Sequence, residues 1–434
     1  MSRLGNRRAT RGAAAVTALL TGLTLVGCGQ IANGANPLQG SDKATGQASA
    51  PAGGEDKEPQ SQPESTPSKS TPPPDPFKVT TNFGDGADNV KIDKTLKITA
   101  ADGKLSSVKV QGKVLDHGET KKVTLDGELN DAKTAWTADA RLEPTGTYTV
   151  KTAGVSDQGT KKSFKSTFET QELSLDDQVF PSFAGTMSGT VGSGTPVVLR
   201  FDLPVTKKAQ VEKHLSVTNS SDQKGSWHWY SDTEVHWRPA NYWKPGTKVT
   251  AKADLNSLPT GDGRYGQMNT STSFTVGDSV VTKVNLKKKV ATAYVNGKKA
   301  RTIPISAGAP GKTETRGGIK LITEKRTDYT MTSEMIGLPK EGPESYELTA
   351  EYAMRITNSG EFLHTATWNA GYFGKKNASH GCVGMSIPDS RWLYKNALPG
   401  SPVEFSGSSR ELEPQNGLTD WNADFETYAE GSAL

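Results

Sequence analysis

The 434-residue sequence predicts a mainly β protein with two β-sandwich domains, followed by a third β-rich unit that carries a short helix. From about residue 79 to residue 278, short segments of alternating apolar and polar residues are separated by turns, a pattern typical of sandwiches. Beyond residue 279, Asn296-Gly297 stands between two strand-like runs and predicts a hairpin with a type I′ turn.

The N-terminus predicts a secretory signal. Four arginines precede an uncharged apolar run over 13–26, which is too short for a convincing membrane span. The run ends in Leu25-Val26-Gly27-Cys28, which resembles a bacterial lipobox, where the cysteine receives a diacylglycerol and becomes the new N-terminus. We expect 1–27 to be a lipoprotein signal peptide and acyl chains on Cys28 to hold the protein at the membrane. The alternative is an ordinary signal with an incidental cysteine.

The charge of the chain argues against a nucleic-acid partner. The formal net charge is +4, and the four arginines of the leader account for it. The remaining sequence is close to neutral and has no polybasic stretch.

Residues 28–76 are predicted to be a disordered tether. They are rich in Gly, Ser, Pro, Gln and Ala and hold few large apolar residues, so they cannot bury enough surface to offset the entropy of ordering. A flexible chain reaches about 5–6 Å × √n, which gives tens of ångströms here. The segment is either a spacer between membrane and folded part or a plain linker.

Two sandwich-sized domains are expected at 77–171 and 172–278. The first contains "TLKITA", "SSVKVQG", "KKVTLDG" and "TGTYTVKTA", and the second contains "PVVLRFDLPV", "SWHWYS" and "EVHWRPA". The tryptophans of the second domain are expected to be core anchors, although Trp227 or Trp243 offers a glycan contact as an alternative. His228 and His236 alternate with them and are predicted to lie on the solvent face of half-buried strands rather than to bind metal.

The third unit is expected at 279–408, with 409–434 packing back on it through aromatic residues. After the hairpin, "GGIKLITE" and "DYTMTS" are strand candidates, and "GEFLHTATW" places His364 near a strand end. Pro388-Asp389-Ser390 predicts a helix start, Pro399-Gly400 its end, and "SPVEFS" a closing strand.

The stretch "NASHGCVGM" contains Cys382, one of only two cysteines. If Cys28 is lipidated, Cys382 has no disulfide partner, and an unpaired thiol in an oxidising compartment indicates a chemical role. A thiol with a pKa of about 8.5 needs help to ionise, and His364 and His380 are the candidate imidazoles. Gly381 allows a close backbone approach, and the N–H groups of Gly381 and Cys382 can point at an oxyanion.

These residues favour acyl transfer by a cysteine nucleophile, with two alternatives. One is a buried, inert cysteine, against which the polar, Gly-rich neighbours argue. The other is a zinc site made by His364, His380 and Cys382, since catalytic zinc sites use three protein ligands.

The stretch from His364 to Met385, "HTATWNAGYFGKKNASHGCVGM", resembles the signature of the YkuD-type L,D-transpeptidases, which cross-link peptidoglycan. That signature is a histidine, a gap of about fourteen residues and then Ser/Thr-His-Gly-Cys, and the gap here, 365–378, is fourteen residues. The lipobox, the tether, "HWRPANYW" and "GLTDWN" extend the resemblance to the multidomain mycobacterial-type enzymes, which carry two immunoglobulin-like domains before a catalytic domain with a lid.

The resemblance implies roles for the site residues. Cys382 is the nucleophile, and His364 either takes its proton or sits beside the thiolate as imidazolium. The backbone carbonyl of Thr365 orients His364, and the N–H groups of His380, Gly381 and Cys382 form the oxyanion hole. The implied substrate-binding residues are Tyr346 and Met331 of the lid, together with Ser359, Gly360, Ser379 and Gly384.

Two departures from the family pattern stand out. Gly384 replaces an Asn that many members carry, which removes an amide group that would bind substrate. The usual Thr-Pro before the lid appears here as "TETRGG", residues 313–318, which puts the stiffness of that segment in doubt.

The implied reaction joins two peptide stems of the cell wall, outside the cytoplasmic membrane. Cys382 attacks the carbonyl before a terminal D-residue, D-Ala leaves, and an amine of a neighbouring stem resolves the thioester as a 3→3 cross-link. No metal or organic cofactor is implied, and carbapenems are expected to acylate the thiol. Water as acceptor would make an L,D-carboxypeptidase and a protein amine a protein-attaching enzyme; a non-catalytic wall-binding scaffold is the alternative from another class.

Overall fold

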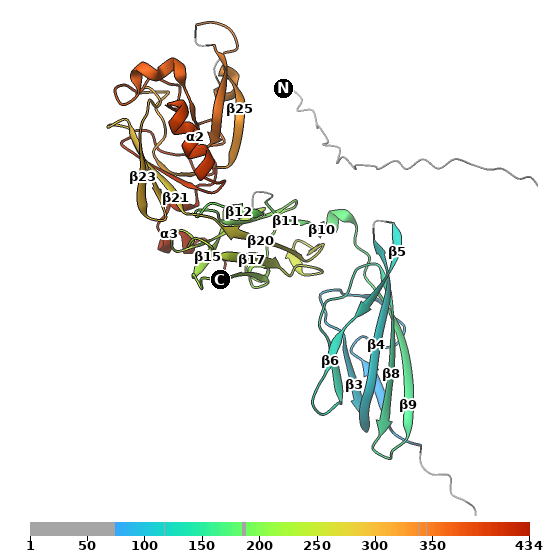
Figure 1. Cartoon of the computed structure of the whole chain (residues 1–434). Helices are drawn as coiled ribbons and strands as arrows, with labels where there is room; N and C mark the ends of the chain where they lie inside the picture. Colours follow the sequence, from blue (N-terminus) through green and yellow to red (C-terminus); the bar gives the residue numbers. More distant parts are fainter. Residues whose placement is uncertain (1–73, 117, 185–187, 338, 344) are drawn as a thin grey trace, which may run out of the picture. The chain divides into compact units, whose positions relative to one another are not determined.

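The computed structural model describes residues 74–116, 118–184, 188–337, 339–343 and 345–434. The predicted signal peptide, Cys28 and the tether up to residue 73 lie outside the described residues. Within the described part, three β-rich domains follow one another along the chain (Figure 1), as the sequence predicted. No helix of this part is long and apolar enough to span a membrane.

The first domain is a sandwich of two sheets. Strand β8 shows the pattern best, because its residues alternate between buried and accessible positions over its whole length. Tyr148 of β8 stacks on Phe168 of β9, with ring centroids 5.2 Å apart. The four-stranded sheet has the order β1 (Lys78–Thr81), β3 (Lys97–Ala101), β7 (Ala135–Ala138), β6 (Gly127–Leu129); the five-stranded sheet has the order β2 (Ala87–Val90), β9 (Lys161–Thr170), β8 (Gly146–Ser156), β4 (Gly103–Asp116), β5 (Glu119–Leu125).

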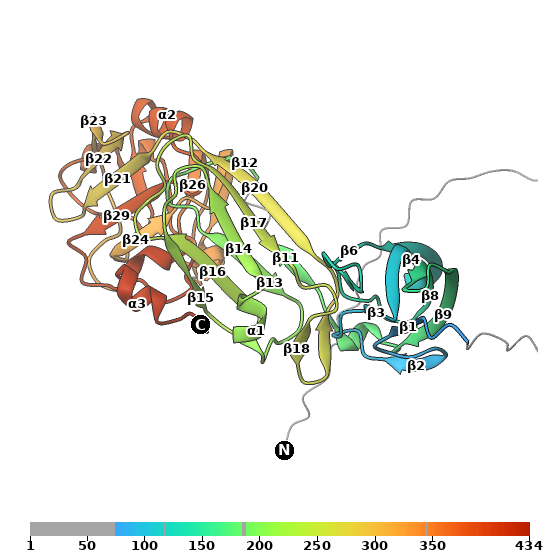
Figure 2. The ribbon, with the colours of Figure 1, turned by 90° about the horizontal axis from the view of Figure 1, so that it is seen from below.

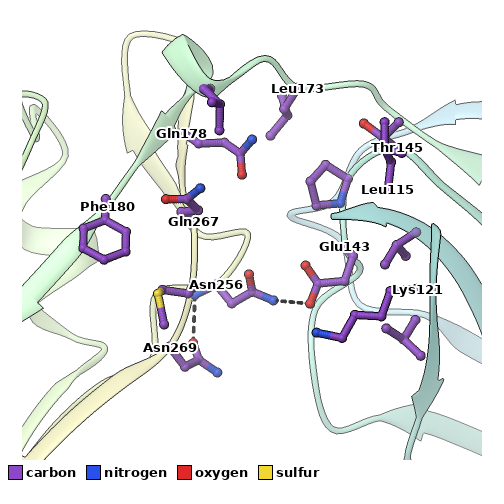
Figure 3. Close-up of a pocket in the computed structure, with 15 residues that line it drawn as sticks. Leu115, Lys121, Glu143, Thr145, Leu173, Gln178, Phe180, Asn256, Gln267 and Asn269 are labelled. Carbon is purple, nitrogen blue, oxygen red and sulfur yellow. Dashed lines mark hydrogen bonds between the residues drawn. The ribbon is translucent and has the colours of Figure 1, made fainter. Parts of the chain in front are cut away.

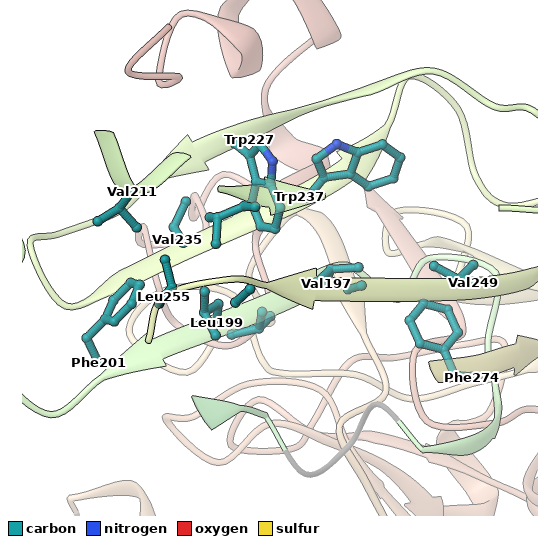
Figure 4. Close-up of a cluster of buried hydrophobic side chains, with 14 of the residues drawn as sticks. Val197, Leu199, Phe201, Val211, Trp227, Val235, Trp237, Val249, Leu255 and Phe274 are labelled. Carbon is teal, nitrogen blue, oxygen red and sulfur yellow. The ribbon is translucent and has the colours of Figure 1, made fainter. Parts of the chain in front are cut away.

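The second domain is a sandwich around the predicted tryptophans. Trp227 and Trp237 face each other across β15 and β16 and are buried, as Figure 4 shows. Trp243 is 1% exposed and stacks on Trp237. The sheets are β11 (Pro181–Phe183), β13 (Val197–Phe201), β16 (Glu234–Pro239), β15 (Gly225–Trp229) and β12 (Gly189–Val191), β20 (Thr270–Val276), β17 (Lys248–Ala253), β14 (Leu215–Asn219), with β10 (Gln178–Val179), β19 (Arg264–Gly266), β18 (Pro259–Gly261) and helix α1 (Lys208–Glu212) beside them.

A polar contact links residues of the first two domains. The Asn256 side-chain amide donates to the Glu143 carboxylate at 2.8 Å, and the Asn256 N–H donates to Asn269 at the same distance (Figure 3). These residues line a pocket of about 530 Å³ together with apolar side chains such as Phe180 and Leu115.

The third domain contains the predicted hairpin, helix and closing strand. Asn296 and Gly297 have φ values of 50° and 79°, as a type I′ turn requires. Helix α2 (Ile387–Asn396) begins at Ser386, whose side chain accepts the N–H of Asp389. One sheet has the order β23 (Lys298–Pro304), β22 (Val290–Val295), β21 (Val280–Asn285), β29 (Pro402–Ser406), β24 (Gly318–Leu321), and the other β25 (Glu324–Thr332), β26 (Glu347–Arg355), β27 (Phe362–Thr365), β28 (Val383–Met385).

The C-terminal segment 409–434 packs on two domains rather than on the third alone. Asn422 bonds to the backbone of Ile319 in β24, whereas the buried guanidinium of Arg238 in β16 donates to the carbonyl of Ala423 at 2.9 Å. Helix α3 (Phe425–Ala429) lies beside β15, as Figures 1 and 2 show.

This packing corrects the prediction for two histidines. His236 is 4% exposed, and its ring nitrogens contact Asp420 and Glu234. His228 is partly buried and stacks on Tyr428. The face that periodicity assigned to solvent is covered, because the C-terminal segment lies over it.

Candidate active site

A cavity of about 270 Å³ in the third domain brings together most of the predicted site residues. It is lined by Cys382, His364, His380, Ser379, Gly384, Tyr346 and Met331, together with Leu348, Ala366, Trp368, Asn369 and Ala378. Ser359 and Gly360 do not line it. The Ser359 hydroxyl instead contacts Thr357 and accepts from Asn416.

Two neighbouring strands bring the thiol and the imidazole into one cavity. β27 and β28 are parallel, and His364 lies opposite Gly384 in their register. Cys382 directly precedes β28, and every residue of β27 is buried. The positions of both candidate catalytic groups are therefore set by the sheet rather than by a free loop.

The tautomer of His364 is fixed by its neighbour. Its Nδ1 lies 2.7 Å from the backbone carbonyl of Thr365, which can only accept, so Nδ1 carries the hydrogen and Nε2 is the basic nitrogen. The Thr365 hydroxyl is in turn bonded to the hydroxyl of Ser390 in α2 at 2.5 Å. Burial lowers the pKa of His364 to about 4, against a smaller raising effect of the Thr365 carbonyl.

The thiol is held in its neutral form. Cys382 Sγ lies 3.6 Å from the carbonyl oxygen of Gly360, the geometry of a weak S–H donor. Burial raises the pKa of Cys382 to about 12, although the Phe362 N–H lowers it. Burial therefore disfavours the charged form of each group, the thiolate and the imidazolium.

The loop before Cys382 narrows the predicted oxyanion hole. The Gly381 N–H donates to the Ser379 hydroxyl at 3.2 Å, and that hydroxyl donates to the Cys382 carbonyl at 2.6 Å. For the N–H groups of His380 and Cys382, no acceptor is recorded within the described ranges. These two N–H groups, rather than three, are left to receive an oxyanion.

The hairpin of β25 and β26 supplies the apolar wall of the cavity. Met331 is 5% exposed and packs with Phe362, Leu348 and Cys382. The Tyr346 ring stacks on His380, with centroids 5.4 Å apart. Met331 and Tyr346 both line the cavity, and their lid roles stay a prediction from the resemblance.

Trp368 is a cavity residue that the sequence analysis did not single out. It lies in the 3-10 helix Thr367–Tyr372, is 51% exposed, and stacks on His364 with ring centroids 5.8 Å apart. Its position four residues after His364 in the quoted motif is the signal that could have identified it.

The zinc alternative finds no support in the ligand geometry. Among the residues that the structure describes, no group of three or more His, Cys, Asp or Glu side chains is placed to hold a metal ion.

Comparisons with known proteins identify the family of the chain. Residues 279–405 match the family model of the L,D-transpeptidase catalytic domain, and residues 87–259, which span both sandwiches, match that of a bacterial Ig domain. L,D-transpeptidase 2 of Mycobacterium tuberculosis is 31% identical over 357 residues, covering 82% of this chain and 85% of the relative. L,D-transpeptidase 5 of the same species is 35% identical over 252 residues, covering 56% and 54%.

A solved L,D-transpeptidase from Mycobacterium smegmatis is similar to part of the fold. It is 28% identical with a TM-score of 0.43, and the match covers 53% of this chain and 99% of that one. The sequence matches carry the assignment: this chain belongs to the L,D-transpeptidase family and joins an immunoglobulin-like region to a YkuD catalytic domain.

Proposed function

We propose that this protein is a cysteine-dependent L,D-transpeptidase that forms 3→3 cross-links between peptidoglycan stems. The observation that carries the proposal is the pairing of β27 with β28, which places His364, fixed by Thr365, in one cavity with Cys382.

The first step is acylation of the thiol. As Cys382 Sγ attacks the carbonyl carbon before the terminal D-Ala, His364 Nε2 takes the thiol proton. The carbonyl oxygen becomes an oxyanion that accepts from the N–H groups of His380 and Cys382. The C–N bond then breaks, and the leaving D-Ala amine takes the proton from His364, which leaves a thioester and a neutral imidazole.

The second step transfers the acyl group to an amine. The side-chain amine of a neighbouring stem attacks the thioester and gives its proton to His364. The C–S bond breaks, and the sulfur recovers that proton. The chemistry needs no metal or organic cofactor.

The cavity suits the neutral starting pair. Its apolar wall at Met331 and Leu348 packs against Cys382, and desolvation there keeps the thiol protonated until a base is in contact with it. Reaction with water instead of an amine would release a shortened stem.

Two further parts of the proposal rest on the sequence. A β-lactam carbonyl is strained and presents the same electrophilic carbon to Cys382, so a carbapenem is expected to form a covalent adduct there. Cys28 is proposed to carry the lipid that places the enzyme outside the cytoplasmic membrane, with residues 28–76 as the tether into the wall.

The test is product analysis with purified enzyme and tetrapeptide muropeptides, comparing wild type with Cys382→Ala. Cross-linked dimers from wild type, and none from Cys382→Ala, are the expected result. Shortened stems alone would replace the proposal by an L,D-carboxypeptidase, and no product at all would favour a wall-binding scaffold. An intact-mass adduct with imipenem is expected on wild type, and its persistence in Cys382→Ala would refute the assignment of the nucleophile.

A further inference from the structure

The segment "TETRGG", residues 313–318, is held by side-chain bonds where many family members carry a proline. The Glu314 carboxylate accepts from the hydroxyl and the N–H of Ser409. Arg316 bonds through Nε to Glu413 at 2.5 Å and through Nη1 to Glu361 at 3.1 Å. The residues on both sides of Thr315, Glu314 and Arg316, are therefore held in place by side-chain bonds, without the stiffness of a proline ring.

Thr315 is fully buried and bonds directly to the loop before the thiol. Its hydroxyl donates to the Gly381 carbonyl at 2.8 Å and accepts the N–H of Gly308 at 2.8 Å. In a trans peptide the C=O and the following N–H point in opposite directions. The bond to the Gly381 carbonyl therefore turns the Cys382 N–H away from Thr315.

The peptide between Ser379 and His380, two peptides earlier in the loop, is held in a similar way. The Ser379 carbonyl accepts from the Ala309 N–H at 2.9 Å, so the His380 N–H points to the opposite side. Thr315 and Ala309 do not line the cavity, whereas His380 and Cys382 do. The carbonyls of Ser379 and Gly381 are thus bonded on the side of the loop away from the cavity. The N–H groups of His380 and Cys382 point to the other side, toward the cavity.

The buried carboxylate of Glu361 links the backbone next to Thr315 with Gly360, the residue whose carbonyl contacts the sulfur. Glu361 is 3% exposed; it accepts the backbone N–H of Arg316 at 3.0 Å and the ammonium of Lys320 at 2.5 Å. It directly follows Gly360, whose carbonyl faces the thiol. Its side chain also lies against Gly381, where a Cβ would meet its Cγ at 3.6 Å.

We propose that Thr315 is a positioning residue for the oxyanion hole: by holding the Gly381 carbonyl, it directs the Cys382 N–H into the cavity. The ionic cluster of Arg316, Glu361 and Lys320 fixes the position of Thr315 relative to the thiol. This inference rests on the proposed acyl transfer. It concerns residues that touch no substrate and act through the backbone of Gly381 and Cys382.

The test compares two reactions of the same thiol. Acylation by imipenem passes through an oxyanion, whereas alkylation by iodoacetamide does not, so only the first depends on the Cys382 N–H. Thr315→Val is expected to slow acylation about 10- to 100-fold relative to alkylation, somewhat less than the 10²–10³ lost with a whole oxyanion donor. Thr315→Ser keeps the hydroxyl and is expected to restore the ratio of the two rates.

Thr323→Val is the control, because it removes a hydroxyl of the same domain that donates to the Arg355 carbonyl and does not line the cavity. Both rates are taken per folded enzyme, with the folded fraction measured by near-ultraviolet circular dichroism, and Thr315→Ala replaces Thr315→Val if that variant does not fold. An unchanged ratio in a folded Thr315→Val or Thr315→Ala variant would overturn the inference while leaving the enzyme assignment intact. Failure of wild type itself to be acylated would instead overturn the proposed function.

Discussion

The Nδ1–H of His364 donates to the carbonyl of Thr365, its own neighbour in the chain, over 2.7 Å. A histidine bound in this way cannot turn without breaking a buried hydrogen bond. Its Nε2 is left basic, and burial keeps the ring neutral with a pKa of about 4. The site is therefore prepared to accept a proton across the whole neutral pH range, because the ring is uncharged above that value.

The first prediction concerns the charge of Cys382 in the resting enzyme. Its pKa is raised to about 12, so ionisation is expected only as the pH approaches that value. The ultraviolet absorbance of the thiolate, taken as wild type minus Cys382→Ala, should show no thiolate between about pH 6 and pH 9.

The His364→Gln variant provides the control for this measurement. A neutral pair predicts the same flat titration in the variant. A thiolate signal near pH 7 that disappears in His364→Gln would show a preformed ion pair and contradict the prediction.

The second prediction concerns His236, which bridges Asp420 at 2.7 Å and Glu234 at 2.8 Å. Burial alone would lower its pKa, but the two carboxylates raise it from 6.5 to about 9. The contribution to folding stability is therefore complete below about pH 6.5 and is lost as the pH rises through about 9, on the order of 2–3 kcal/mol. Urea unfolding at both ends of this window should show the loss in wild type and a smaller loss in His236→Gln.

His228→Gln is the matched control for that experiment. His228 lies on the adjacent strand and bonds to the backbone carbonyl of Tyr428, with no carboxylate recorded as its partner in the described ranges. The His228→Gln variant should keep the wild-type dependence of the free energy of unfolding on pH. An equal loss of stability in His236→Gln and wild type would rule out His236 as its source.

The sequence predicted local features well and long-range ones poorly. Asn296-Gly297 specifies its turn by positive φ values that few residue pairs tolerate, and the signature from His364 to Cys382 lies within twenty residues. His236 was assigned to solvent because a period of two separates the faces of a strand without saying what covers each face. Its cover, Asp420, is 184 residues away.

The same reasoning explains the narrowed oxyanion hole. The motif supplies the N–H groups of His380, Gly381 and Cys382, but the Ser379 hydroxyl takes that of Gly381. The groups that bond to the loop carbonyls come from another part of the chain: Thr315, for example, bonds to the Gly381 carbonyl. No local pattern in the motif predicts these partners.

A third prediction follows from the contact between Gly384 and Ala366. A Cβ on Gly384 would lie 2.5 Å from the Cβ of Ala366, so an Asn cannot be accommodated without a shift of the strands. Gly384→Asn is expected to lower the free energy of unfolding by about 1–3 kcal/mol, measured by urea denaturation.

Ala366→Gly in the same chain should recover part of this loss, which a double-mutant cycle would record as a coupling energy. Gly371→Ala is the control, because a Cβ there meets nothing within 4 Å. Additive effects of the Gly384 and Ala366 changes would show that the two positions do not clash.

The fourth prediction concerns the buried ion pair between Lys320 and Glu361. The Lys320 ammonium lies 2.5 Å from Glu361, with side chains that are 0% and 4% exposed. Lys320→Met removes one partner and leaves a buried carboxylate with less compensation, which typically costs about 3–5 kcal/mol. Adding Glu361→Gln removes the unpaired charge, so the double variant should lose less free energy of unfolding than the sum of the two single changes.

Lys283→Met is the matched surface control. The Lys283 ammonium pairs with Glu404 at 3.3 Å but its side chain is 59% exposed, and its loss should cost under about 1 kcal/mol. Equal costs for the two lysines, measured by urea denaturation, would mean that the buried pair is as well solvated as the surface one.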